Sequence, residues 1–157
     1  MRPEYFQLID RIVSINLTER AITVEADVPL TSTIFEGHFP GHPLMPGVLL
    51  IEAMAQTSGW LLIALNQFER MPFLAAVKEA KLRTFVKPGQ RLTLDGSLVH
   101  DGSGYAITEV KTRADGKLVC QSTLTFHLTP FPTDDFRKQM RETASKLSFP
   151  AELMTHG

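Results

Sequence analysis

The sequence predicts an α+β fold in which one long apolar helix is wrapped by a curved antiparallel sheet. Residues 48–65 form an almost uninterrupted apolar run, long enough for a helix of five turns. Most other segments alternate between apolar and polar residues, which is the period of a half-buried strand. Tight turns such as 101–104 separate these segments, and strands joined by tight turns are antiparallel.

Composition limits the function classes. A chain of 157 residues forms one domain with a real core. Its net charge of −1, without a basic cluster among aromatics, argues against nucleic-acid binding. The single cysteine, Cys120, excludes an internal disulfide, and its strand-like surroundings favour a buried structural thiol over a nucleophile. The N-terminus has no apolar h-region, so we expect no signal peptide and a cytoplasmic location.

The helix at 48–65 reaches the threshold length for a membrane span. It contains Glu52 and Gln56, and an ionised carboxylate within a span costs about 2.5–3.5 kcal/mol even on the most lenient scale. A helix that is apolar nearly all round is otherwise typical of a protein core. We therefore expect a buried helix and no stable membrane insertion.

The predicted strands stand on both sides of this helix. Two precede it and four follow it, and the first of the four is expected to place Ala80, Leu82, Thr84 and Val86 on one face before the break at Pro88–Gly89. A sheet of this size can cover the helix on most sides, so the helix forms the core. The expected strands are 8–17, 21–30, 77–87, 91–100, 105–114 and 117–128.

Residues 130–157 differ from the preceding domain, which we place at 1–129. Prolines bracket 133–148, where Thr133 or Asp134 can cap a helix. We predict an amphipathic helix that docks on the domain or on a partner subunit, with a membrane-surface role as a lesser alternative. Its apolar stripe would consist of Phe136, Met140, Ala144 and Leu147.

The segment at 37–47, Gly-His-Phe-Pro-Gly-His-Pro-Leu-Met-Pro-Gly, is the least regular of the chain. Its prolines forbid a continuous helix, so His38 and His42 are not a helical metal pair, and without a third ligand nearby a zinc site is disfavoured. The segment can instead hold His38 in a constrained loop. Pro46 suits a first helical turn, and Gly47 offers a backbone N–H that can bind a developing oxyanion.

Glu52 follows less than two turns into the apolar helix. A carboxyl group there must be paired, reach solvent through a cleft or stay protonated. Gln56 lies one turn further on the same face and can orient it. Together with His38, these residues provide an acid, a base and an electrophilic helix end. The residues alone are equally compatible with a structural Glu–Gln pair and a loop histidine; His42, His100, His127 and His156 have no evident role.

The stretch at 37–56, GHFPGHPLMPGVLLIEAMAQ, resembles the signature of the 3-hydroxyacyl-acyl-carrier-protein dehydratases of fatty acid synthesis (FabZ-type, with the FabA-type as cousins). The resemblance includes the spacing from His38 to Glu52, and weaker similarity extends from Leu8 to about Phe126. It implies the hot-dog fold. Glutamate at position 52 favours the FabZ type, because FabA-type enzymes usually carry aspartate there.

The resemblance also implies residue roles. His38 would be the catalytic histidine and Glu52 the catalytic acid. The N–H of Gly47 would hold the thioester carbonyl, the carbonyl of Leu44 would orient the imidazole, and Gln56 would hydrogen-bond Glu52.

The implied reaction is dehydration of a (3R)-3-hydroxyacyl thioester on acyl carrier protein to the trans-2-enoyl thioester, in fatty acid or lipid A acyl chain synthesis. Phosphopantetheine tethers the substrate, and neither a metal nor a redox cofactor is expected. The family implies a homodimer with active sites shared between subunits, often a trimer of dimers. The alternatives are a hot-dog thioesterase and a non-catalytic module that binds acyl chains or carrier protein.

Acyl carrier proteins are typically acidic, so a nearly neutral chain needs a local basic patch to dock one. Lys81, Arg83 and Lys87 are expected on one face of the strand after the helix. The plainer interpretation is that they are the solvated face of a half-buried strand.

Overall fold

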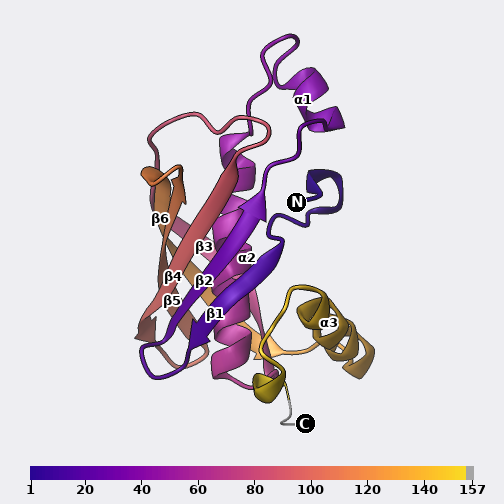
Figure 1. Ribbon diagram of the computed structural model, residues 1–157. Helices are drawn as coiled ribbons and strands as arrows, with labels where there is room; N and C mark the ends of the chain where they lie inside the picture. Colours follow the sequence, from indigo (N-terminus) through magenta and orange to yellow (C-terminus); the bar gives the residue numbers. More distant parts are fainter. Residues whose placement is uncertain (155–157) are drawn as a thin grey trace.

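The computed structural model describes residues 1–154, and these residues form one antiparallel sheet with the order β1-β2-β4-β5-β6-β3 (Figure 1). The strands are β1 (Arg11–Asn16), β2 (Ala21–Asp27), β3 (Arg70–Leu82), β4 (Arg91–Asp101), β5 (Tyr105–Ala114) and β6 (Lys117–Pro130). The helices are α1 (Thr33–Gly37), α2 (Gly47–Leu65) and α3 (Asp134–Lys146), with short 3₁₀ turns at Pro3–Tyr5 and Ala151–Leu153.

Helix α2 is the core element, and the sheet curves around it (Figure 1). Leu61 and Ile63 are buried against the strands, and the Ser58 and Thr108 hydroxyls, also buried, lie 2.7 Å apart across the interface between helix and sheet. The helix is long and apolar enough to cross a membrane, but 61% of its most apolar window is buried within the protein. The prediction of a buried central helix is confirmed.

Five predicted strands are found close to their expected positions, and β5 has the predicted bounds. The prediction for β3 is wrong at both ends. The strand begins at Arg70 and ends at Leu82, so Arg83, Thr84, Val86 and Lys87 lie beyond it and do not share a face with its residues. Of the four residues expected to share one face, only Val86 is buried.

Local features explain this correction. Pro72 argues against a strand at this point of the sequence. However, β3 is an edge strand, where proline is tolerated. The register of β3 against β6 shifts between Lys78 and Lys81, and this bulge interrupts the alternation. The Arg83 N–H still donates to the Val119 carbonyl of β6 at 2.8 Å. The chain then leaves the sheet, and the Val86 carbonyl accepts a hydrogen bond from the Met45 N–H at 2.8 Å.

Edge strand β3 carries apolar side chains that this chain leaves uncovered. Phe73, Leu74, Val77 and Leu82 are each 40–49% exposed. An edge with free backbone groups and apolar side chains is a ready partner for another strand, and natural proteins seldom leave one open.

Helix α3 docks on its own domain, beside α2 in Figure 1. The Thr133 hydroxyl caps it by accepting the Phe136 N–H at 3.1 Å. Beyond the helix, the Leu147 carbonyl accepts the Ile12 N–H at 2.7 Å, and the Phe149 ring packs edge-on against Trp60. The domain boundary at 129/130 stays a prediction.

Cys120 is fully buried in β6, as predicted. Burial raises the pKa of its thiol, which keeps it protonated and unreactive in the folded protein.

Candidate active site

A short hydrogen-bonded loop holds His38. Helix α1 ends just before it, and the His38 N–H donates to the Ile34 carbonyl at 3.0 Å. The His38 carbonyl in turn accepts the Leu44 N–H at 3.0 Å, and Phe39 and His42 exchange two backbone hydrogen bonds between these points. The backbone of His38 is therefore fixed on both sides, as its proline-rich surroundings predicted.

The imidazole of His38 is oriented by Leu44. Its Nδ1 lies 2.9 Å from the Leu44 carbonyl oxygen. A carbonyl can only accept, so the neutral ring carries its proton on Nδ1 and leaves Nε2 free as a base. The ring also stacks on Phe39, with centroids 4.0 Å apart.

Gly47 is the first residue of α2, and Pro46 before it supplies no side-chain cap. The N–H groups of Gly47 and Val48 precede the first backbone hydrogen bonds of the helix, in which Leu49 and Leu50 donate to the Pro46 carbonyl, and they lie at its positive end. Leu82 at the end of β3 packs against Gly47 so closely that a Cβ there would collide with its Cδ1. Glycine leaves room for this contact, whereas a larger residue would displace the half-exposed Leu82 side chain.

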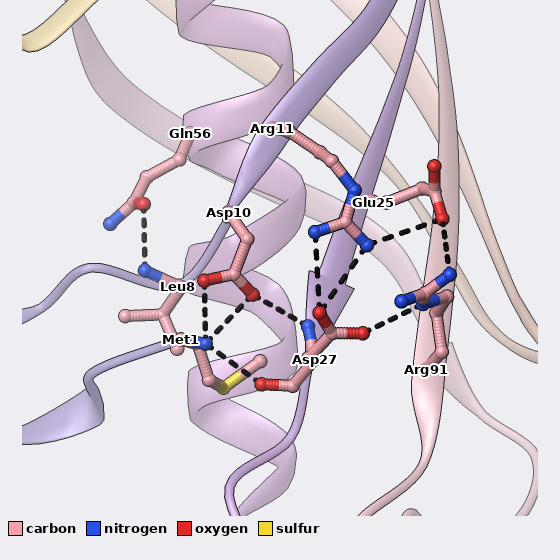
Figure 2. Close-up of polar contacts among 8 residues, drawn as sticks. All are labelled: Met1, Leu8, Asp10, Arg11, Glu25, Asp27, Gln56 and Arg91. Atoms are coloured by element: carbon pink, nitrogen blue, oxygen red, sulfur yellow. Dashed lines mark hydrogen bonds and ion pairs between the residues drawn. The ribbon is translucent and has the colours of Figure 1, made fainter. Parts of the chain in front are cut away.

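Glu52 and Gln56 lie one turn apart on α2. The Gln56 Nε2 donates to Glu52 Oε1 at 3.1 Å and to the Phe6 carbonyl at 2.6 Å. The Gln56 Oε1 accepts the Leu8 N–H at 3.1 Å, as Figure 2 shows. No sequence pattern predicts this contribution of the N-terminal segment, because backbone groups at Phe6 and Leu8 make the contacts.

A second polar network beside this segment fixes the start of the chain (Figure 2). The Met1 α-amino group donates to both carboxyl oxygens of Asp10, at 2.7 and 2.8 Å, and to the Asp27 carbonyl. Asp27 also pairs with Arg91 at 2.8 Å and with Arg11 at 3.3 Å. The Arg91 guanidinium foremost, and then that of Arg11, hold the pKa of the Asp27 carboxyl below its usual value.

A cavity of about 530 Å³ opens beside Glu52, which lines it together with Gln56. His38, Leu44 and Gly47 are not among its lining residues. The chain thus forms two separate pairs, His38 with Leu44 and Glu52 with Gln56, and presents only the second to the cavity.

The basic residues Lys81, Arg83 and Lys87 are all exposed, and no ion pair found within residues 1–154 engages them. His42 is likewise exposed. His100 lies 3.0 Å from the Tyr105 hydroxyl on the surface, and His156 lies outside the described residues.

Solved structures define the class of fold. A conserved protein from Pseudomonas aeruginosa superposes with a TM-score of 0.63 at 22% identity, covering 80% of this chain and 90% of its own. A hypothetical thioesterase from Streptococcus pneumoniae, solved with coenzyme A, gives a TM-score of 0.60 at 20% identity, covering 76% of this chain and 85% of its own. The chain has the hot-dog fold that these proteins share, and the likeness shows the fold alone.

The FabA-like domain family matches residues 1–123, so the chain belongs to that family. Among its relatives, the 3-hydroxyacyl-[acyl-carrier-protein] dehydratase FabZ of Latilactobacillus sakei is 43% identical over 124 residues, which is 76% of this chain and 85% of that protein. The protein of the same name from Chlamydia pneumoniae is 37% identical over 128 residues, covering 78% of this chain and 82% of its own.

Proposed function

We propose that this chain dehydrates (3R)-3-hydroxyacyl-acyl-carrier-protein to trans-2-enoyl-acyl-carrier-protein in fatty acid biosynthesis. The relatives named FabZ dehydratases, which are 37% and 43% identical to this chain, support this reaction. The structural observation that carries it is a pair of oriented groups: a histidine with a free Nε2, and a carboxyl group that lines a cavity and is held by an amide.

The first chemical step removes a proton from C2 of the substrate. The Gly47 N–H, at the positive end of α2, donates a hydrogen bond to the thioester carbonyl oxygen and stabilises the charge that builds on it. Nε2 of neutral His38 takes the proton, and the Leu44 carbonyl stabilises the imidazolium through Nδ1–H.

The second step expels the hydroxyl group from C3. Glu52 in its protonated form donates a proton to that oxygen, which leaves as water while the electrons of the broken C2–H bond form the C2–C3 double bond. Gln56 keeps the carboxyl group in place through Nε2. Proton exchange with solvent then returns His38 to its neutral form and Glu52 to its acid form. Neither metal nor redox chemistry enters these steps, so we expect no such cofactor.

We further propose that the active protein is a homodimer in which the His38 of one subunit meets the Glu52 of the other. The segment that carries His38, with α1, projects beyond the end of the sheet (Figure 1). A projecting segment is suited to reach a neighbour. The cavity beside Glu52, in turn, has no histidine among its lining residues.

The proposed interface is the uncovered edge of β3 and the apolar side chains around it. Val48 and Phe85 are more than 70% exposed, and Phe39 is about half exposed, in addition to the apolar residues of β3. A second copy of the chain would cover these groups by pairing β3 with its own β3, the self-complementary contact of a two-fold dimer. Assembly of three such dimers, and a cytoplasmic location, are part of the same proposal.

The test is incubation with 3-hydroxyacyl-acyl-carrier-protein and analysis of the carrier protein by mass spectrometry. Dehydration leaves the acyl group on the carrier and lowers its mass by one water. A thioesterase would instead use water to release the whole acyl group as a carboxylic acid, leaving the carrier protein with a free phosphopantetheine thiol. An unchanged carrier, with the substrate bound, would identify a non-catalytic binding module and overturn the proposal.

A further inference from the structure

The cavity beside Glu52 continues along α2 toward the C-terminal half of that helix. Glu52, Gln56, Gly59 and Ile63 line it at intervals of about one turn. From Glu52 to Ile63 the helix rises about 16 Å. The cavity therefore follows the helix well beyond the carboxyl group.

The sides of this cavity are largely apolar. The N-terminal segment contributes Phe6 and Ile9 on one side, and β3 contributes Met71 and Leu74. Since Glu52 is proposed to act at C3, the carbons beyond C3 must leave the reaction centre from that point. The apolar cavity extends from Glu52, so we expect the carbons beyond C3 to occupy it.

Helix α3 supplies a further wall. Its lining residues Met140, Thr143 and Lys146 recur every three positions, and Leu147 follows at the C-cap, so the side of the helix faces the cavity. The edge-on contact of Phe149 with Trp60, itself a lining residue, fixes α3 against the C-terminal half of α2. Helix α3 and Phe149 lie beyond residues 1–123, the part matched by the FabA-like family.

We propose that α3 forms the distal wall of the acyl-chain site and that Met140 determines how well long acyl chains are accepted; the proposal rests on the dehydratase function above. Met140 is the long, flexible apolar side chain of α3 that faces the cavity and is half-buried against the core. Short substrates end near Glu52 and do not reach it. Each methylene that gains apolar cover changes binding by about four-fold.

The experiment compares kcat/KM for 3-hydroxybutanoyl-, 3-hydroxyoctanoyl- and 3-hydroxyhexadecanoyl-acyl-carrier-protein. Met140→Ala removes the apolar contact and should lower kcat/KM for the hexadecanoyl substrate roughly ten-fold while the butanoyl value stays unchanged. Met140→Glu, which places a charge in the wall, should lower it further. Gln139→Ala, an exposed neighbour on the same helix, is the matched control.

Equal losses on all three substrates would mean that Met140 only supports the fold, and would overturn the proposal. A rise in kcat/KM of Met140→Ala for the hexadecanoyl substrate would mean that Met140 limits chain length and does not bind the chain. That result would also overturn the proposal. If the wild-type protein dehydrates the butanoyl substrate but Met140→Ala leaves the length profile unchanged, the function stands and this inference fails. If the wild type dehydrates none of the three, the proposed function itself fails.

Discussion

The side-chain amide of Gln56 fixes the carboxyl group of Glu52. Its Nε2 donates to Glu52 at 3.1 Å, while its Oε1 accepts from the backbone of Leu8. Since the Leu8 N–H can only donate, the amide cannot turn round without losing both bonds. The N-terminal segment therefore controls the orientation of a candidate catalytic group on α2.

Replacing Gln56 by methionine preserves its volume and removes all three side-chain hydrogen bonds. We expect kcat to fall by roughly ten- to hundred-fold, because a hydrogen bond to a charged or strongly polar group contributes about 1.5–3 kcal/mol. KM should change little if Gln56 acts only through Glu52. Steady-state kinetics on acyl-carrier-protein substrate measure both, and Gln139→Met on the surface of α3 is the control. An unchanged kcat would contradict the positioning role.

The roles proposed for His38 and Glu52 predict that both are needed. His38→Ala and Glu52→Gln should each lower kcat by about 10²–10⁴-fold, the usual contribution of a positioned base or acid. His42→Ala is a matched control, because His42 lies in the same loop but its side chain is exposed. Near-wild-type turnover by either site variant, in protein shown to be folded, would make the assignment wrong.

A shared site predicts complementation between two inactive variants. Refolding His38→Ala together with Glu52→Gln should yield heterodimers with one intact site and one doubly altered site. Purified heterodimers, made separable by a different affinity tag on each chain, should then show about half of the wild-type activity. Heterodimers that remain inactive would mean that each chain builds its own site.

The sequence predicted what depends on local pattern. Helix α2 and strand β5 follow from periodicity and turns, and the resemblance at 37–56 placed His38 beside Leu44. Contacts that depend on the tertiary fold could not be predicted from the sequence. The backbone partners of Gln56 lie 48 and 50 residues away, and β3 was misplaced because an edge strand tolerates Pro72.

The ion pairs around Asp27 predict a specific dependence of stability on pH. Its pKa is lowered in the folded state, so the carboxylate stabilises the fold above its unfolded pKa, and this contribution disappears as the pH falls through the lower folded value. Because the side chain is 46% exposed, the contribution at neutral pH is at most about 1 kcal/mol.

Urea unfolding tests this contribution. Asp27→Asn should be less stable than wild type near neutral pH, and the difference should vanish in strong acid, where both side chains are uncharged. Glu19→Gln, in an exposed turn, is the control. A difference that persisted unchanged in strong acid would show that Asp27 acts through its neutral hydrogen bonds and not through its charge.

The last prediction concerns how the carrier protein docks. Leu82 packs against Gly47, so its neighbours Lys81 and Arg83 flank the start of α2, where the thioester is proposed to bind. Both side chains are exposed. We expect an acidic partner there because Lys81 and Arg83 lie next to the proposed site. The expectation of a common strand face does not support it. The alternative is that they are ordinary solvated residues.

Charge reversal distinguishes the two. Lys81→Glu with Arg83→Glu should raise KM for substrate on acyl carrier protein, and the effect should shrink as salt rises, because exposed charges at the rim of an interface act mainly on association. A short pantetheine-linked 3-hydroxyacyl substrate lacks the acidic protein and should be turned over as before. Lys138→Glu on α3 reverses an exposed charge far from Gly47 and should leave both substrates unaffected. Equal losses on both substrates would place Lys81 and Arg83 in the fold or the active site, and the docking proposal would be wrong.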